Sequence, residues 1–449
     1  MAASVSPFLL TPKFPSMQNS CSLPTSFLLT VPTNPRQALS LSLSNPRTPR
    51  TFCCSLPNQT ADQNGNAENK TGECLRVAFA AGGTGGHIYP AVAIADQLKN
   101  INPNTQILFF GTPKSMESKA VTSAGYDFAT IRAVPLVRPP LSLRNLLFPY
   151  QLFKSLIESW NKLRDFNPHI VVGTGGYVSF PVCLAAAFKG LRLVIQEQNS
   201  VPGIANWVLS YFADQVFVAF NSSIACFPKK NKYVVTGNPV RASVRQNVSK
   251  ADARLLFFPK SEKARDSKAK VVLVLGGSLG AHAINIAILN LYHQMLLEHK
   301  NWFLVWQTGV EAFDEMESLV KVHPHVLLRP FLRSMDLAYA AADLIVSRAG
   351  AMTCSEILAA GKPSVLIPSP NVSEGHQFAN ASLMADLAGS RIITEDELDS
   401  TTLGIVIEEI LGDEHGMTEM CERALKAAKP NASTEIAQSI VFLANSLKA

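Results

Sequence analysis

The chain has 449 residues, of which 47% are hydrophobic and 16% are charged. This length suffices for two domains with separate cores, and the composition excludes a disordered, collagen-like or disulfide-scaffold protein. The formal net charge is +6, but four basic residues and no acidic residue lie in 1–60, so the rest, with 36 basic and 34 acidic residues, is nearly neutral. The charge therefore gives no support for a nucleic acid partner.

The first 60 residues have the composition of a targeting sequence. They hold 17 Ser or Thr and nine Pro residues, and a serine-rich stretch without acidic residues is typical of an organelle transit peptide. The prolines argue against a mitochondrial presequence helix, and the first basic residue, Lys13, comes too late for a secretory signal. We expect 1–73 to be a chloroplast transit peptide and linker, and the protein to work in the stroma or at the stromal face of a plastid membrane. A disordered regulatory tail is the alternative.

From about residue 75, short apolar runs alternate with segments of helical length. Continuous runs of Val, Ile, Leu and Phe are typical of parallel strands that are buried on both faces. The predicted strands are 76–81, 106–110, 128–133, 170–173, 191–196, 215–219, 233–236, 271–275, 303–307, 326–329, 344–347, 364–367 and 391–394. The alternation predicts an α/β protein with two doubly wound, Rossmann-like parallel sheets.

A charge-rich segment, 250–270, interrupts this pattern near its middle. We expect an N-terminal domain over 74–240, a C-terminal domain over 241–430, and a last helix within 431–449 that packs back on the N-terminal domain. Ligands of such sheets bind outside the carboxyl ends of the strands. The two domains are therefore expected to face each other across a cleft.

Each half opens with a glycine-rich loop directly after its first strand, GGTGGH at 82–87 and GGSLGAH at 276–282. Glycines let the backbone approach a ligand, and the start of the following helix favours anions. Neither loop fits the dinucleotide fingerprint, because Ile88 stands where the third glycine of the first loop is required. A P-loop is excluded because no Gly-Lys-Ser/Thr run occurs.

The sequences of these loops and of further segments resemble those of the bacterial MurG family (glycosyltransferase family 28). Enzymes of this family add N-acetylglucosamine to lipid-linked muramyl-pentapeptide in peptidoglycan synthesis. The segments are GGTGGHIYPAVAIA (82–95), GTGGYVSFP (173–181), QEQNSVPGIAN (196–206), GNPVR (237–241), GGSLGA (276–281), SRAGAMTCSE (347–356) and HQFANA (376–381). The resemblance implies the two-domain glycosyltransferase-B fold. It also implies an inverting displacement, in which an α-linked UDP-sugar gives a β-1,4 product.

His87 is the candidate catalytic base. It lies in the first helical turn after a glycine loop, and an imidazole can take the proton of a sugar hydroxyl near neutral pH. The resemblance implies this role toward the acceptor's 4-hydroxyl, with Thr84, Gly85 and Gly86 beside the donor diphosphate or the acceptor phosphate. The alternative is a histidine that only caps the helix.

A polar run at 196–199 follows a buried strand, which indicates a site more than a core. The resemblance assigns Asn199 to donor contact and leaves Glu197 as a second candidate acid/base or acceptor-binding residue. Arg241 is expected at the hinge between the domains, where a guanidinium can clamp a diphosphate. An ordinary hinge salt bridge is the alternative for Arg241.

The second domain carries the predicted UDP-sugar site. A helix is expected to begin near Met352, and the amides at its start, with the helix dipole, would receive the UDP phosphates. Glu356 offers two oxygens to the ribose hydroxyls, unless it is a solvent-facing helix residue. Gln377 can bind sugar hydroxyls, Ser278 is expected over the phosphates, and the backbone of Leu332 resembles the position that reads uracil. The remaining predicted contacts are Ala351, Thr353, Cys354 and Ser355.

The sequence departs from the family at two positions on the donor side. Leu279 stands where the family has a glutamine after the serine of the second glycine loop, and His376 replaces the first of two paired glutamines. We expect these changes to affect sugar selectivity or rate.

Neither metal nor cofactor is expected, because no Asp-x-Asp and no His-Glu-x-x-His run occurs. Helix dipoles and Arg241 would stabilise the leaving UDP instead.

The segment 139–164 interleaves Leu and Phe with Arg and Lys, so Leu143, Arg144, Leu147 and Phe148 are expected to face an anionic membrane that carries the acceptor. The alternative is that the same apolar stripe packs in the core.

The sequence thus predicts a UDP-N-acetylglucosamine-dependent hexosyltransferase that acts on a polyprenyl-diphosphate-linked N-acetylmuramyl-pentapeptide in plastids. One alternative is a related UDP-sugar transferase with another lipid acceptor, such as diacylglycerol. Another is a catalytically silent plastid protein retained for membrane or division-partner contacts. The complete GGTGGHIYPA and QEQN motifs favour the first hypothesis.

Overall fold

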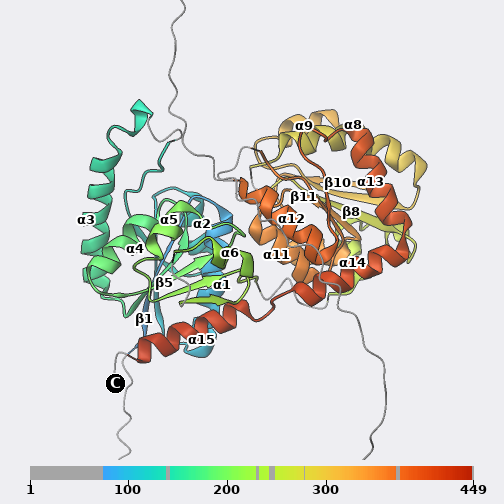
Figure 1. The fold of residues 1–449 in the computed structure, drawn as a ribbon. Helices are drawn as coiled ribbons and strands as arrows, with labels where there is room; N and C mark the ends of the chain where they lie inside the picture. The colour runs from blue at the N-terminus through green and yellow to red at the C-terminus, as the bar shows by residue number, and fades with distance from the viewer. Residues whose placement is uncertain are drawn as a thin grey trace, which may run out of the picture. The chain divides into compact units, whose positions relative to one another are not determined.

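The fold is carried by two parallel sheets, each covered by helices (Figure 1). The computed structural model describes residues 74–137, 142–228, 232–241, 248–277, 279–370 and 375–446. The predicted transit peptide and linker, 1–73, lies outside these residues.

The first sheet has seven strands in the order β3-β2-β1-β4-β5-β6-β7, and every pairing is parallel. Its strands are β1 (Arg76–Ala81), β2 (Gln106–Gly111), β3 (Asp127–Thr130), β4 (Ile170–Gly175), β5 (Arg192–Glu197), β6 (Gln215–Val218) and β7 (Tyr233–Val235). Their apolar side chains are buried because helices cover both faces of the sheet.

The second sheet has six parallel strands in the order β10-β9-β8-β11-β12-β13. They are β8 (Lys270–Leu275), β9 (Trp302–Gln307), β10 (Val326–Arg329), β11 (Leu344–Ser347), β12 (Ser364–Leu366) and β13 (Arg391–Ile392). Every strand predicted from the sequence is present, and the prediction of two Rossmann-like parallel sheets is confirmed.

The helices follow the strands, as doubly wound sheets require. Around the first sheet lie α1 (Gly85–Ile101), α2 (Met116–Ser123), η1 (Leu143–Asn145), α3 (Phe148–Phe166), α4 (Ser179–Phe188), α5 (Ile204–Leu209) and α6 (Asn221–Ala225). The later helices are α7 (Lys250–Phe257), η3 (Glu262–Arg265), α8 (His282–Glu298), α9 (Phe313–Leu319), α10 (Met335–Ala341), α11 (Ala351–Ala360), α12 (His376–Ala388), α13 (Ser400–Gly412), α14 (Glu414–Ala427) and α15 (Ala432–Asn445).

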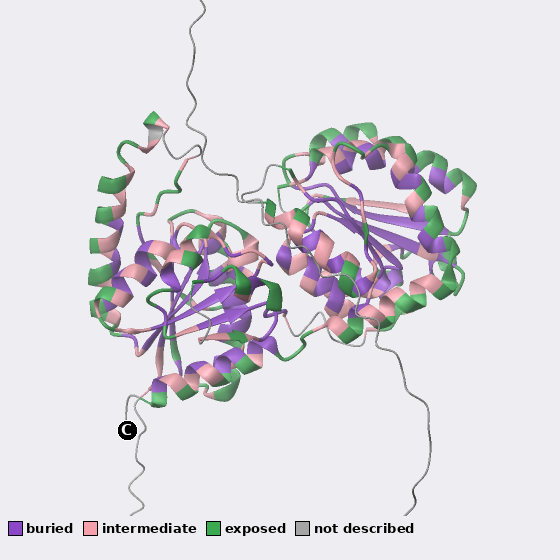
Figure 2. Ribbon diagram, viewed as in Figure 1, coloured by how far each residue is buried: buried purple, intermediate pink, exposed green. Residues whose placement is uncertain are grey.

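The last helix, α15, packs against α1 rather than against the sheet that precedes it in the chain (Figure 1). Ile436, Ala437 and Ile440 are fully buried and share a core with β1 and α1. The buried faces of the helices and the buried strands are visible together in Figure 2. Within the described residues, the first strand and the last helix therefore share one core.

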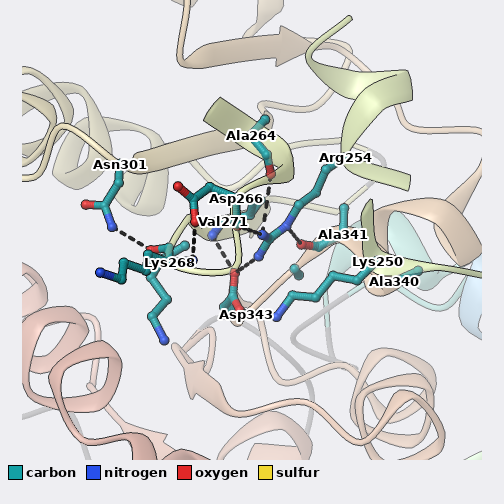
Figure 3. A network of polar contacts seen from close by, with 12 residues as sticks. Lys250, Arg254, Ala264, Asp266, Lys268, Val271, Asn301, Ala340, Ala341 and Asp343 are labelled. Carbon is teal, nitrogen blue, oxygen red and sulfur yellow. Dashed lines mark hydrogen bonds and ion pairs between the residues drawn. The ribbon is translucent and has the colours of Figure 1, made fainter. Parts of the chain in front are cut away.

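A buried ion pair fixes α7 to the second sheet (Figure 3). Arg254 and Asp343 are each about 3% exposed, and the guanidinium is paired with the carboxylate, which also accepts a hydrogen bond from the Val271 amide at 2.6 Å. Arg254 also donates to the Ala341 carbonyl at 3.2 Å, and Lys250 is the second cation on Asp343. These contacts join the segment between the two sheets to β8 and to the start of β11.

Candidate functional site

Strand order determines where each sheet can bind a ligand. The order in which the strands are added reverses between β1 and β4 in the first sheet and between β8 and β11 in the second, although all strands are parallel. A crevice forms outside the carboxyl ends of the strands at such a switch point. The loops that leave these four strands carry the glycine and SRAGA motifs of the sequence analysis.

The two glycine motifs of the first sheet pack backbone against backbone. A Cβ at Gly176 would lie 2.0 Å from the carbonyl oxygen of Gly82, and the φ of Gly176 is +83°. Any other residue would both clash and adopt an unfavourable backbone conformation. The motif GTGG is therefore explained by its contact with the motif GGTGG.

His87 lies in this junction, in the first turn of α1. Its ring is beside Gly175, where a Cβ would lie 2.9 Å from His87 Cδ2, and Thr84 Oγ1 is 3.2 Å from His87 Nδ1. The Thr174 hydroxyl donates to the His87 carbonyl at 2.7 Å, which fixes the backbone. Burial lowers the pKa of His87 below its usual value, while the Glu197 carboxylate acts in the opposite direction. The neutral imidazole, which can accept a proton, is thus favoured near neutral pH.

Glu197 ends β5 and is almost completely buried. One carboxylate oxygen accepts from the Asn199 amide and side chain, each at 3.0 Å. The other accepts from the Gly203 amide at 3.1 Å and from Asn206 Nδ2 at 2.8 Å. Four donors satisfy this carboxylate, so the geometry favours a positioning role for Glu197 over the acid/base role considered from the sequence.

Asn199 connects this loop to the second domain. Its side-chain nitrogen donates to Glu197, and its Oδ1 lies 3.4 Å from Asn380 Nδ2. Asn380 also accepts from the amide and the hydroxyl of Ser200, at 3.0 and 2.9 Å. Asn380 lies on α12, so the loop after β5 and the motif HQFANA are in direct contact.

Arg241 and Glu356 form another contact of this kind. Arg241 Nη2 lies 3.9 Å from Glu356 Oε1, and the guanidinium carbon is 4.8 Å from the centre of the Tyr89 ring on α1. Glu356 is 9% exposed and accepts from the Tyr339 hydroxyl at 2.9 Å. Burial raises the pKa of Glu356, and Arg241 and Tyr339 partly offset this effect.

The start of α11 also faces the site. The intrahelical ladder begins with the Cys354 amide, which donates to the Gly350 carbonyl at 2.9 Å. The amides of Ala351, Met352 and Thr353 precede this bond, so they point out of the helix start. An N-terminal helix end of this kind favours a phosphate.

Two predicted contacts on α11 are corrected by the structure. The Cys354 side chain is fully buried in the core, where burial raises the pKa of its thiol to about 12. Ser355 accepts from Asn238 Nδ2 at 2.9 Å and lines a separate, smaller pocket. Cys354 is about 200° around the helix from Met352 and from Glu356, so it faces the core, whereas Ser355 lies about 60° from Met352 and faces the smaller pocket.

Two glutamine side chains, one at the end of β9 and one in the first turn of α12, hold the backbone near the positions predicted to read uracil and to bind sugar. Gln307, the last residue of β9, accepts from the Leu332 amide at 2.9 Å and donates to the Gly277 carbonyl at 3.0 Å. Gln377 accepts from the Ser369 amide at 2.9 Å. Ser278, predicted over the phosphates, lies outside the described residues.

The groups of the candidate site line one cavity of about 1520 Å³. Its lining includes the predicted residues Thr84, Gly85, Gly86, His87, Glu197, Asn199, Arg241, Leu332, Ala351, Met352, Thr353, Glu356 and Gln377. Leu279 and His376, the two departures from the family, line it as well. His376 is near enough that it lowers the pKa of His87 further.

The predicted membrane-facing residues lie apart from most of this lining. Leu143 and Leu147 are strongly exposed, whereas Phe148 lines the cavity. The side chain of Arg144 is outside the described part of the structure. Among the described residues, no helix is both long and apolar enough to cross a bilayer.

A possible metal-binding group lies elsewhere. Within the described part of the chain, Glu298, His299 and Glu408 have ligand atoms within 4.8 Å of one another. They lie at the end of α8 and on α13, and none of them lines the cavity.

Several residues that build the site were not predicted from the sequence. Gln307 had a detectable signal, since it is a polar residue at the end of an otherwise apolar strand. Asn206 and Asn380 lie inside the quoted motifs but were given no role. Tyr89 and Tyr339 had no such signal, because their importance depends on contacts with Arg241 and Glu356.

Known proteins show the same two-part organisation. The model of the glycosyltransferase family 28 N-terminal domain matches residues 77–218, and the model of the C-terminal domain of that family matches residues 271–438. The chain is 38% identical over 382 residues, 84% of its length, to the complete UDP-N-acetylglucosamine--N-acetylmuramyl-(pentapeptide) pyrophosphoryl-undecaprenol N-acetylglucosamine transferase of Flavobacterium psychrophilum. The identity to the enzyme of the same name from Christiangramia forsetii is 41%, covering 83% of the chain and 99% of that enzyme.

Solved structures support the same assignment. The crystal structure of Acinetobacter baumannii MurG is 28% identical and superposes with a TM-score of 0.63, covering 82% of this chain and 99% of that one. A UDP-N-acetylglucosamine 2-epimerase, 15% identical with a TM-score of 0.58 over 82% of this chain and 96% of its own, shares the fold alone. Two family models in order and near-complete coverage of the relatives lead to one conclusion: the chain belongs to glycosyltransferase family 28.

Proposed function

We propose that this glycosyltransferase moves N-acetylglucosamine from UDP-N-acetylglucosamine to the 4-hydroxyl of a lipid-diphosphate-linked N-acetylmuramyl-pentapeptide. One observation carries the proposal: a single cavity is lined both by His87 with its glycine loops and by Glu356 with the start of α11. The relatives that are about 40% identical over their whole length have names that specify this donor and this acceptor.

The reaction needs one proton acceptor and a stabilised leaving group. His87, favoured in its neutral form by burial, takes the proton of the 4-hydroxyl as the oxygen attacks the anomeric carbon. The bond from that carbon to the UDP oxygen breaks, and the configuration inverts from α to β. The negative charge that develops on UDP is met by the amides at the start of α11 and by Arg241.

Residues of the second sheet, its helices and its loops recognise the donor in this proposal. Glu356 is held by Tyr339 and presents its carboxylate to the ribose hydroxyls, while Gln307 fixes the backbone of Leu332 where uracil would be read. Gln377, anchored by its bond with the Ser369 amide, lies where it can bind the sugar. These assignments rest on geometry together with family membership.

A membrane surface for the acceptor is proposed on η1 and α3. The helix buries Ser155 and Ser159, and it exposes Tyr150, Phe153 and Ile157 along one side, as Figure 2 shows for the helix as a whole. Apolar residues spaced by three or four positions form a stripe, and burying them in an interface would remove them from water. Basic groups border this stripe, with Lys154 Nζ 4.4 Å from the Tyr150 ring centre and Lys189 Nζ 4.5 Å from that of Trp160.

A plastid location is proposed from the Ser-rich, acid-free segment 1–60. The test is import of the full chain into isolated chloroplasts. The proposal predicts a shortened, protease-protected product, and a full-length protein left outside would contradict it.

The function itself is tested by incubating the protein with radiolabelled UDP-N-acetylglucosamine and the lipid-linked muramyl-pentapeptide, or with diacylglycerol in its place. We expect label in the muramyl lipid and release of one UDP for each sugar transferred. Label in diacylglycerol alone would favour the lipid-acceptor alternative. No transfer from any UDP-sugar to either acceptor would favour the silent protein.

A further inference from the structure

Part of the lining of the cavity that holds His87 is apolar and comes from the segment after β3 and from α3, α4 and α5; this part is called the arm below. Val134, Pro135, Leu136, Leu152, Phe180 and Ile204 line it, and none of the six can donate a side-chain hydrogen bond. None of the six is among the residues proposed to bind the donor. The arm therefore needs a ligand group of its own.

One wall of the arm is an extended segment that is fixed at both ends. The Arg132 amide donates to Glu158 on α3 at 2.9 Å, and the Val137 amide donates to Asn145 on η1 at 2.9 Å. Between these two contacts Val134 and Leu136 are 42% and 44% exposed. Because hydrogen bonds anchor the backbone on either side, these exposed side chains are held in place along the cavity.

Another part of the arm follows elements that lie beside the proposed catalytic base. Phe180 lies on α4, which begins directly after the glycine loop that touches the His87 ring. Ile204, at the start of α5, is 60% exposed, and α5 follows the loop held by Glu197. Phe180, Ile204 and His87 thus line the same cavity.

The chemistry of the acceptor identifies the occupant. In the proposed reaction the 4-hydroxyl is at His87, the sugar ring and diphosphate follow, and the lipid chain begins beyond the diphosphate. The donor and the peptide offer no long apolar chain, whereas the name of the relatives' acceptor includes a polyprenol. We propose that the arm binds the first isoprene units of the acceptor, an inference that rests on the proposed function.

Such a subsite solves a problem of transfer from the membrane. When the sugar of a membrane lipid enters a cleft, the isoprene units next to the diphosphate leave the bilayer. Exposing these apolar units to water is unfavourable. Each buried methylene group contributes about fourfold in affinity. An apolar arm that begins near the exposed stripe of α3 compensates for this loss, because Leu152 of the same helix lines it.

The test uses three soluble muramyl-pentapeptide diphosphates that carry a methyl group, two isoprene units or a saturated chain of equal length. Affinities are measured by calorimetry in the absence of donor, and transfer is measured separately, with the full chain, the double variant Leu136→Ser/Ile204→Ser and the control Leu256→Ser. Leu256, on α7, is 63% exposed and lies outside the cavity lining, so it matches Ile204 in exposure.

The proposal predicts that the native chain binds both long acceptors at least tenfold more tightly than the methyl acceptor, and that the double variant loses most of this preference. Leu256→Ser should retain it, and the affinity for UDP should be unchanged in all three proteins. Equal affinity for methyl and isoprenyl acceptors in the native chain would contradict the proposal that the arm binds isoprene units. A preference for long acceptors that survives the double substitution would contradict it as well. Tight, chain-dependent binding without transfer would instead contradict the proposed function and leave the arm supported.

Discussion

The guanidinium of Arg241 and the carboxylate of Glu356 are paired, with Nη2 of the first 3.9 Å from Oε1 of the second. Arg241 follows the last strand of the first sheet, and Glu356 lies on α11 of the second. The pair therefore joins the residue proposed to hold the diphosphate to the residue proposed to hold the ribose. The salt bridge considered for Arg241 as the alternative is therefore present, and its contact with a diphosphate stays a prediction.

Replacing Glu356 tests the donor site. Glu356→Gln removes the negative charge but keeps the shape, and hydrogen bonds to a charged group contribute about 1.5–3 kcal/mol. We expect the KM for UDP-N-acetylglucosamine to rise by about 10- to 100-fold in steady-state assays. Tyr339→Phe, which keeps the carboxylate and removes only its 2.9 Å hydrogen bond, should raise the same KM by less than about tenfold. An unchanged KM in Glu356→Gln would remove this residue from the donor site.

The pH dependence of the reaction tests the environment of His87. Because burial lowers the pKa of His87, its neutral form persists to more acidic pH, and the acid limb of kcat/KM should lie below pH 6.5. The two neighbours act with opposite signs. Glu197→Gln removes an effect that raises the pKa and should move the limb to lower pH, whereas His376→Gln removes an effect that lowers it and should move the limb to higher pH. Shifts of the same sign in both variants would contradict this assignment.

The glycine beside the histidine has a specific steric role. Gly175 has a φ of +99°, and a Cβ there would lie 2.9 Å from His87 Cδ2. Gly190 has a φ of +69° but nothing within 4 Å of its Cβ position. Both Gly175→Ala and Gly190→Ala should lose about 1–2 kcal/mol of folding free energy from backbone strain. Only Gly175→Ala should also lower kcat, by displacing the imidazole; equal kcat in the two folded variants would show that the contact is not needed.

The buried pair of Arg254 and Asp343 should dominate the stability of the second sheet. Asp343→Asn leaves a buried guanidinium without its carboxylate, which costs about 3–5 kcal/mol. Glu409→Gln breaks the pair of Arg391 and Glu409, which are 59% and 55% exposed, and should cost no more than about 1 kcal/mol. Urea denaturation of the two variants measures the difference, and equal costs would argue against the structural role of Asp343.

The sequence predicts the sheets well because parallel buried strands are continuous apolar runs, a signal that is local in the chain. For example, the predicted strand 170–173 is observed as β4, and the segment of helical length that follows it is observed as α4. The partners of Glu197 were not predictable in this way. Asn199, Gly203 and Asn206 come into range only when the loop after β5 folds over the carboxylate.

The errors on α11 have a geometric cause. The sequence analysis expected a helix near Met352, which is within one residue of the observed start at Ala351. Cys354 and Glu356 are two residues apart, which corresponds to about 200° of helical rotation, so their side chains cannot both face the cavity. Cys354 therefore faces the core, while Glu356 faces the cavity.

The central claim, transfer of N-acetylglucosamine with His87 as the base, is tested most directly by one comparison. Transfer from UDP-N-acetylglucosamine to the lipid-linked muramyl-pentapeptide is measured for the native chain and for His87→Ala, with UDP affinity measured in parallel. The account predicts turnover by the native chain and a rate lower by about 10²- to 10⁴-fold in His87→Ala, with UDP binding retained in both. Equal turnover by the two proteins, or no turnover by the native chain, would contradict it.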